Sequence, residues 1–165
     1  MLKGKNVYLR KTIPEDAEDS AKWLNDNEVI KFLGIEEVVT PKSRRQFLQT
    51  KLKDPTEHIF SIISSDDDKY IGNIYLYKTD KERREAEIGI FIGDKTCWKK
   101  GCASEAIDLI VEYGFKNLGL KRIYAKVIEE NIAAIKCFEK CKFLKEDEEY
   151  DEVSNEKLLV LSLFR

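Results

Sequence analysis

The stretch from Gly93 to Ala106 holds the residues of this sequence best suited to chemistry. Gly101 and Ala103 stand where a long amphipathic helix should begin, after an apolar strand and a short loop. Unpaired amides at a helix start attract anions, as does the helix dipole, and short side chains let a phosphate approach the backbone. Lys99 and Lys100 add positive charge nearby. The pattern indicates a phosphate site, although a helix start that merely happens to hold a glycine fits it too.

Several other kinds of phosphate or metal site are disfavoured. The sequence has neither the Gly-Lys-Ser/Thr ending of a P-loop nor the three spaced glycines of a dinucleotide motif. Its single histidine, His58, excludes metal sites built from several histidines. The cysteines are spaced more widely than zinc-binding pairs, and disulfides would be unusual in a reducing cytoplasm. We therefore predict no metal, and free thiols that pack as small hydrophobes at Cys97, Cys102, Cys137 and Cys141.

Length and composition predict a single domain spanning residues 1–165. The chain is 42% hydrophobic and 36% charged, and its net charge of −2 gives no basic surplus for nucleic acid. No apolar run approaches the roughly 20 residues of a membrane helix. The first residues lack the apolar core of a signal peptide, so a cytoplasmic location is the expectation.

Apolar periodicity and turn residues predict the elements that must position the phosphate-binding stretch. In the first half we expect a strand at 6–11, a helix begun by a capping box of Thr12 and Glu15, a short helix at 29–33, and a helix opened by Thr40. In the second half we expect strands at 58–64, 70–78, 85–93, 122–128 and 158–164, with helices at 101–118 and 131–140. The acidic stretches 66–68 and 146–152 are expected to be solvated loops, although either could attract a cationic amine.

The order of these elements indicates the fold class. A helix bracketed by the strands 85–93 and 122–128 favours a right-handed crossover between parallel strands. The first two strands of the second half, by contrast, form a hairpin. We therefore expect an α/β or α+β protein with a mixed sheet. The expected core positions of its helices are Ala17, Ala21, Leu24, Phe47, Leu48, Ala103, Ala106, Ile107, Ile110, Val111, Gly114 and Leu118.

Three separated segments resemble the GCN5-related N-acetyltransferase (GNAT) superfamily. The segments AEIGIFIGDK (86–95) and WKKGCASEA (98–106) are similar to its acetyl-CoA motif, and NIAAIKCFEK (131–140) is similar to its second signature helix. VYLR (7–10) and WLND (23–26) resemble N-terminal elements of the branch that contains ribosomal-protein N-terminal, spermidine and amino-sugar acetyltransferases. The resemblance covers nearly the whole chain. It implies a GNAT-like mixed central sheet with splayed parallel strands and helices on both faces.

The resemblance also implies a function. The chain would transfer acetyl from acetyl-CoA to an amine acceptor by direct attack in a ternary complex; the acceptor could be a protein N-terminus, a polyamine or an amino sugar. A homodimer is left open. The implied cofactor contacts are Phe91, Ile92, Gly93, Lys99, Lys100, Gly101, Cys102, Ala103, Ser104, Asn131 and Phe138. Asn131 could equally serve as a helix N-cap, and the two roles can coexist.

A non-catalytic acyl-CoA-binding module is the alternative. Phe138 and Ala134 replace residues that could donate a proton in relatives, and Lys99 and Lys142 replace glycines. A positive φ at Lys99 would cost about 1 kcal/mol or more. Cys137 would be a weak substitute acid.

The remaining expectations concern catalysis and the acceptor. An amine must lose its proton before it attacks a thioester, so a base is needed. The two-residue period of a strand places Glu87 and Gly89 on the face away from the core. Glu87 is the candidate base, with room for water or substrate beside Gly89, although it could be a solvated strand residue. The resemblance places Trp23, Asn25 and Glu28 on the acceptor side, but Trp23 also fits a core position.

Overall fold

The computed structural model describes residues 1–165. Its strands are β1 (Leu2–Lys3), β2 (Val7–Lys11), β3 (His58–Ser64), β4 (Tyr70–Asp80), β5 (Glu85–Ile92), β6 (Arg122–Ile128), β7 (Leu144–Asp151) and β8 (Glu156–Phe164). Its helices are α1 (Ala17–Trp23), α2 (Asn27–Ile30), α3 (Pro41–Lys51), α4 (Cys102–Lys116) and α5 (Ile132–Lys140), with 3-10 turns η1 (Pro14–Asp16) and η2 (Lys95–Cys97). None of the helices has both the length and the apolar character needed to cross a lipid bilayer.

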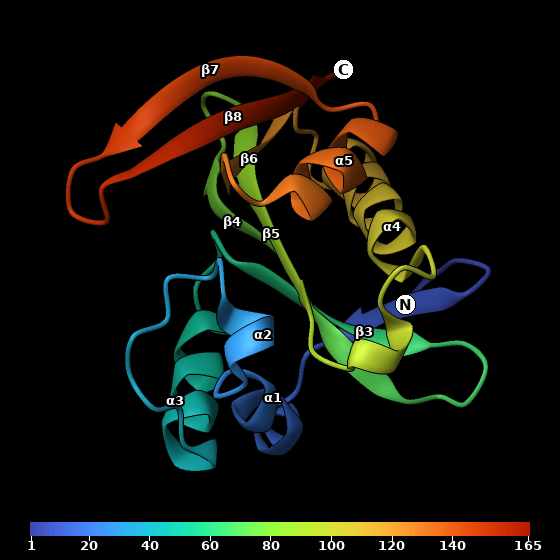
Figure 1. The fold of residues 1–165 in the computed structure, drawn as a ribbon. Coiled ribbons are helices and arrows are strands. Elements are labelled where there is room, and N and C mark those ends of the chain that lie inside the picture. Colours follow the sequence, from blue (N-terminus) through green and yellow to red (C-terminus); the bar gives the residue numbers. More distant parts are fainter.

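All strands join one sheet in the order β1-β2-β3-β4-β5-β6-β8-β7 (Figure 1). Only β5 and β6 are parallel, and α4 connects them as the expected crossover. Their pairing covers only Glu85–Glu87 and Arg122–Tyr124, whereas β5 continues to Ile92 and β6 to Ile128. The two strands therefore diverge and leave a wedge between them, as Figure 1 shows. The mixed sheet with splayed parallel strands is confirmed.

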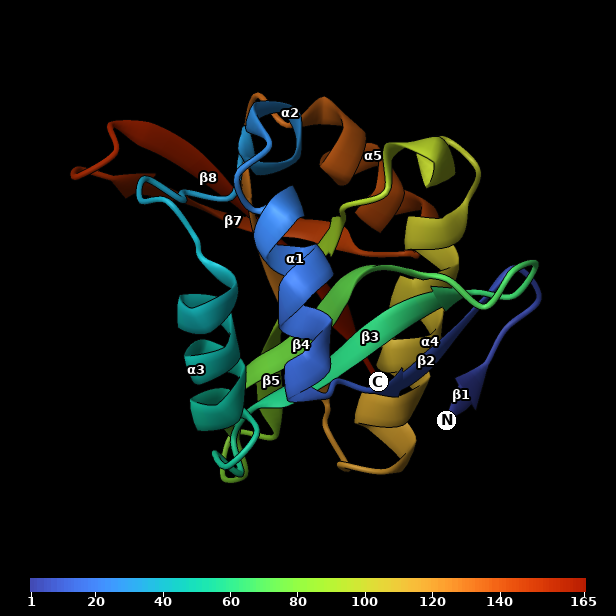
Figure 2. The ribbon, with the colours of Figure 1, turned by 90° about the horizontal axis from the view of Figure 1, so that it is seen from below.

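Helices cover both faces of this sheet (Figure 2). The alternation of side chains along β3 separates the two layers: Phe60 and Ile62 join the main core under α4, whereas Ile59 packs with Ala17 of α1 and Leu48 of α3. The buried stripe of α4 includes Ala106, Ile107, Ile110 and Gly114, as predicted. The main core thus fixes α4 against the sheet, and α4 in turn positions the loop at its start.

Two expectations about the elements are wrong. The stretch 146–152 was expected to be a loop, but most of it belongs to β7. The side chains of β7 are nearly all exposed, so apolar alternation could not reveal it; backbone pairing with β8 and ion pairs such as Lys126–Glu149 hold it in place. Phe47 was expected in the core but is 43% exposed, and the cationic groups of Arg44 and Lys51 lie near its ring.

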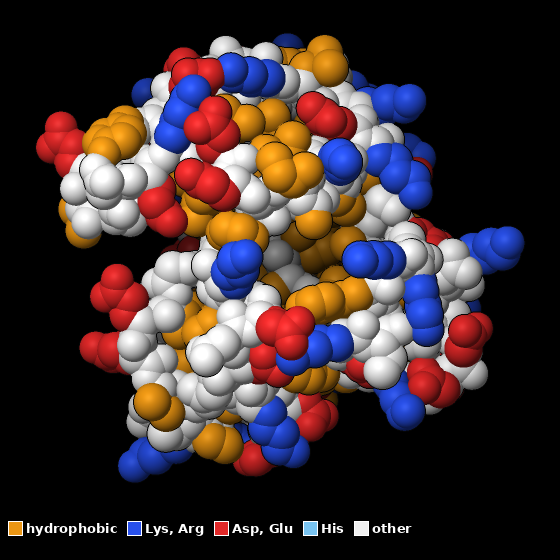
Figure 3. Space-filling view, viewed as in Figure 1, with side chains coloured by type: hydrophobic (Ala, Val, Ile, Leu, Met, Phe, Trp, Pro, Cys, Tyr) orange, Lys and Arg blue, Asp and Glu red, His pale blue; other side chains and the backbone are white.

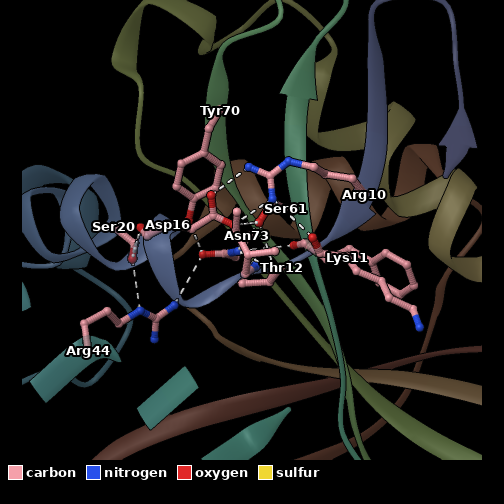
Figure 4. A network of polar contacts seen from close by, with 11 residues as sticks. Arg10, Lys11, Thr12, Asp16, Ser20, Arg44, Ser61, Tyr70 and Asn73 are labelled. Atoms are coloured by element: carbon pink, nitrogen blue, oxygen red, sulfur yellow. Dashed lines mark hydrogen bonds and ion pairs between the residues drawn. The ribbon is translucent and has the colours of Figure 1, made fainter. Parts of the chain in front are cut away.

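The capping box at the first helix uses a different residue from the one predicted. The backbone N–H of Ile13 donates to the Asp16 carboxylate rather than to Glu15, because the helical turn begins at Pro14. Asp16 is also the centre of a buried polar network (Figure 4). It accepts hydrogen bonds from Arg10 at 2.7 and 2.8 Å and from the Ser61 hydroxyl at 2.7 Å. The network ties β2, η1 and β3 together beneath α1.

The Asp16→Asn substitution should destabilise the protein by about 2 kcal/mol at pH 7. Burial of the Asp16 carboxyl opposes its ionisation, but hydrogen bonds from Arg10, Ser61 and the Ile13 N–H outweigh burial and hold its pKa below the ordinary value. The depressed pKa means that Asp16 stabilises the fold above about pH 4 and loses this effect as the pH falls through the folded-state pKa. Urea unfolding of both proteins at pH 7 and below pH 4 measures this, and an equal deficit at both pH values would contradict it.

Candidate active site

A cavity of about 610 Å³ lies where the end of β5 meets the start of α4. It is walled by the last residues of β5, the loop and first turn of α4, one face of α5, and the segment from Glu28 to Leu33. Figure 3 shows the hollow with apolar side chains inside and lysine or arginine side chains on its rims. Of the predicted site residues, those that line it are Glu28, Phe91, Ile92, Lys99, Gly101, Cys102, Ala103, Ser104, Asn131 and Phe138. Those that do not line it are Trp23, Asn25, Glu87, Gly93 and Lys100.

The start of α4 presents a row of unused hydrogen-bond donors. Gly101 is the N-cap with φ 82°, a conformation that glycine adopts without strain, and no side chain caps the helix. The first helical bond runs from the Glu105 N–H to the Gly101 carbonyl. None of the backbone N–H groups from Lys99 to Ser104, which we call the α4 mouth, donates to another group of the protein. These N–H groups lie at the positive end of the helix dipole, which favours a bound anion.

Replacing Lys99 by glycine should raise the free energy of unfolding by about 0.5 to 1 kcal/mol. Lys99 has φ 60°, which confirms the strain expected from the sequence, and Lys142 has φ 71°. Glycine removes the strain energy of the left-handed backbone in the folded state. This gain exceeds the loss of stability caused by the greater conformational entropy of glycine in the unfolded chain. Lys142→Gly should raise the free energy of unfolding by a similar amount. Lys100→Gly is the matched control, because Lys100 has no positive φ. Thermal or urea unfolding of this variant should show no increase in the free energy of unfolding.

The edge of β5 that faces the wedge offers further backbone groups. The Gly93 N–H donates to the Ile71 carbonyl on the β4 side. Alternation along an antiparallel pair therefore directs the backbone groups of Phe91 toward β4 as well, and those of Ile90 and Ile92 toward the wedge. The Ile92 carbonyl accepts a hydrogen bond from the Trp98 indole N–H at 2.9 Å. Within the predicted segment Phe91–Gly93, only the Ile92 N–H thus remains available to a ligand.

Helix α5 forms another wall of the cavity. The side-chain oxygen of Asn131 accepts a hydrogen bond from the Ala134 N–H at 3.2 Å, so Asn131 is the N-cap and also lines the cavity. Phe138 is 4% exposed and packs edge-on against Phe143, with ring centroids 5.1 Å apart. Neither Phe138 nor Ala134 can supply a proton to the cavity.

The cysteines divide into two groups. Cys102 and Cys141 pack within the main core, as small hydrophobes should. Cys97 and Cys137 are half-buried and line the cavity, as Cys102 also does. A hydrogen bond with Cys141 lowers the pKa of the Cys137 thiol.

Glu87 lies outside the cavity, on the sheet face away from α4. It is 4% exposed, so it is not a solvated strand residue. The Tyr77 hydroxyl donates to one carboxylate oxygen at 2.6 Å, and the Lys78 ammonium donates to the other at 2.8 Å. The space expected beside Gly89 is occupied, because a Cβ there would come within 3.2 Å of the Tyr77 ring and 3.7 Å of the Tyr75 ring.

The three predicted acceptor contacts have different surroundings. Trp23 packs over Gly93 and against Tyr70, with ring centroids 4.9 Å apart, which is a packing role. The Asn25 amide bonds both backbone groups of Val39 and so clamps the loop between α2 and α3. Only Glu28 reaches the cavity, where its carboxylate pairs with Lys95 at 3.1 Å.

Several cavity residues were not singled out from the sequence as site residues. Helix α2 contributes Val29, the segment after it contributes Phe32 and Leu33, and α5 contributes Lys136 and Lys140. The two lysines are four residues apart in the sequence, a spacing that places both on one face of a helix. The sequence therefore contained a signal for these two site residues. The segment after α2 carries no comparable pattern.

Comparison with known proteins gives relatives along most of the chain. Residues 6–144 match the profile of the acetyltransferase (GNAT) domain family. An uncharacterized N-acetyltransferase named p20 from Bacillus licheniformis is 36% identical over 148 residues, which cover 88% of this chain and 83% of that protein. The probable N-acetyltransferase YjcK from Bacillus subtilis is 32% identical, with 88% and 84% of the two chains covered.

Solved structures share the fold at lower identity. The spermidine N-acetyltransferase from Vibrio cholerae, solved in complex with CoA and spermine, superposes with a TM-score of 0.89 at 21% identity and covers 98% of this chain and 96% of that one. An acetyltransferase from Bacillus anthracis gives a TM-score of 0.86 at 24% identity, with 99% and 97% covered.

Proposed function

Because this chain belongs to the GNAT acetyltransferase family, we propose that it is an N-acetyltransferase that moves acetyl from acetyl-CoA directly to an amine. The unpaired N–H groups of the α4 mouth carry the proposal, since they form an anion site at the rim of an apolar cavity. Residues 1–165 would act as one domain.

The cavity can hold the parts of acetyl-CoA in order. The diphosphate takes the N–H groups of the α4 mouth, and Lys99 adds charge beside it. The pantetheine arm follows the open edge of β5 at Ile90 and Ile92, between β5 and α5. Asn131 and Phe138 flank it. The spermidine N-acetyltransferase of the same fold was solved with CoA, which supports CoA as the co-substrate.

The reaction needs few groups from the protein. The amine lone pair attacks the thioester carbonyl, a C–N bond forms, and the oxyanion of the tetrahedral intermediate lies within reach of the Ile92 N–H. The C–S bond then breaks, and CoA leaves as a thiolate while the nitrogen loses its proton. Because a thiol has a pKa near 8.5, the thiolate can leave without an acid at Phe138 or Ala134.

The acceptor would be a protein N-terminus, a polyamine or an amino sugar. The spermine bound to the structural neighbour supports a polyamine. Glu28 is the only carboxylate that lines the cavity, and it is paired with Lys95. A cationic acceptor that enters here would therefore have to displace Lys95 from Glu28.

Release of CoA thiol from acetyl-CoA, measured with a panel of amines, tests this function. We expect turnover well above the enzyme-free rate with at least one amine of these classes. Binding of acetyl-CoA without turnover of any amine would leave a non-catalytic module. If acetyl-CoA does not bind at all, the assignment of the cavity as an acetyl-CoA site is also wrong.

We further propose that Glu87, with the Tyr77 hydroxyl that donates to it at 2.6 Å, accepts the amine proton through water, because neither residue lines the cavity. Glu87→Gln should then lower kcat by about 10²-fold or more. Lys78→Met is the matched control, because it removes the other hydrogen-bond partner of Glu87 but keeps the carboxylate, so most of the activity should remain. If Glu87→Gln only lowers stability and keeps the parent's kcat, Glu87 is a structural ion-pair partner.

A further inference from the structure

The charges around the cavity are mostly positive and unpaired. Its charged lining residues are Glu28, Lys99, Lys136 and Lys140. Glu28 pairs with Lys95, which also pairs with Asp26, whereas none of the three lining lysines forms an ion pair. The chain as a whole has a net charge of −2. The positive character of the cavity is therefore local and suits an anionic ligand.

Lys136 and Lys140 form a pair on α5. They stand four residues apart, so their side chains leave the same face of the helix, and this face lines the cavity. Like charges at this spacing destabilise a helix by a few tenths of a kcal/mol. Glu139 lies on the same helix, yet it bonds neither lysine. Two like charges are thus held together on a cavity wall, on the helix that ends beside the α4 mouth.

The two positive groups match the two anionic parts of CoA. The α4 mouth, with Lys99, suits the diphosphate. The ribose 3′-phosphate is the other anionic group and carries a charge of about −1.5 to −2 at neutral pH. Helix α5 ends beside the α4 mouth, where the Cys141 thiol donates to the Ser104 carbonyl at 3.4 Å. A CoA whose diphosphate is bound at the mouth would therefore carry its ribose 3′-phosphate near the face of α5 that holds Lys136 and Lys140.

We propose that Lys136 and Lys140 bind the 3′-phosphate of CoA and make the protein select CoA over dephospho-CoA. This inference rests on the proposed function, because it takes CoA to be the occupant of the cavity. The same pair would reject an acyl group carried on a phosphopantetheine arm, which has no ribose 3′-phosphate. Lys136 and Lys140 are therefore specificity residues for the acyl donor.

Calorimetric titration with CoA and with dephospho-CoA tests the proposal. The parent protein should bind CoA about 10- to 100-fold more tightly than dephospho-CoA, as expected for two charged hydrogen bonds to one phosphate. The Lys136→Gln/Lys140→Gln double variant should lose this factor for CoA and bind dephospho-CoA as the parent does. Lys42→Gln/Lys53→Gln is the matched control, because both lysines are exposed, unpaired and outside the cavity. It changes the net charge equally and should preserve the preference.

The outcomes separate this proposal from the proposed function. If the parent binds both ligands equally, the phosphate subsite is wrong while the CoA assignment stands. If the Lys136/Lys140 variant loses affinity for CoA and for dephospho-CoA equally, the phosphate subsite is also wrong. The lysines would then contribute to binding of a part that both ligands share. If neither ligand binds the parent, the proposed function itself fails.

Discussion

The Ala103→Glu substitution should weaken acetyl-CoA binding by about 100-fold or more while the fold becomes slightly more stable. Ala103 lies in the first turn of α4 and lines the cavity, and the backbone N–H groups around it are unpaired. A carboxylate at this position satisfies those N–H groups and interacts favourably with the helix dipole, by about 0.3 to 1 kcal/mol. The same carboxylate would occupy and repel the place of the diphosphate. Stability and ligand affinity should therefore change in different directions.

The Ala103→Gln variant separates charge from size. Glutamine fills the same volume without the negative charge, so it should weaken binding by about tenfold, clearly less than glutamate. Urea unfolding and calorimetric titration of the parent and both variants give the four comparisons needed. An Ala103→Glu protein that binds acetyl-CoA like its parent would show that the α4 mouth is not the phosphate site.

The Gly93→Ala substitution should destabilise the protein by about 3 kcal/mol. A Cβ on Gly93 would lie 2.0 Å from an atom of the Trp23 ring, a distance that two non-bonded carbons cannot adopt. The ring cannot easily move away, because it packs against Tyr70 and Phe91. The clash would push α1 away from the end of β5, next to the cavity. Activity should fall together with stability.

Two comparisons identify the clash as the cause. Gly89→Ala lies on the same strand, but its Cβ would approach Tyr77 only to 3.2 Å, so its cost should be much smaller. Trp23→Leu in the Gly93→Ala background removes the clashing ring and should recover part of the lost stability, which a double-mutant cycle in urea unfolding measures. Additive effects of Trp23→Leu and Gly93→Ala would mean that the two residues do not meet.

The parts of the fold that the sequence predicts are those with a repeating apolar pattern. The stripe of α4 appears in the structure as expected, because burial of one helix face imposes a fixed period on the residues. Along β5, Ala86 and Ile88 join the main core as expected. β7 has no buried face, and its place in the sheet comes from pairing with β8, which leaves no periodic signal.

The same reasoning explains which parts of the candidate site could be predicted from the sequence. The α4 mouth could be predicted, because Gly101 and the small residues after it are adjacent in the sequence. The surroundings of Asn25 and Glu87 could not, because their partners Val39, Tyr77 and Lys78 come from other segments. A strand pattern shows that Glu87 faces away from the core, but it does not show which side chains cover it.

A crystal structure of the protein with bound CoA tests the central claim most directly. We expect diphosphate oxygens about 3 Å from backbone nitrogens of the α4 mouth, Lys99–Ser104, with the pantetheine arm running along β5 toward Phe138. CoA bound with its diphosphate away from these nitrogens, or outside the cavity altogether, would contradict the account.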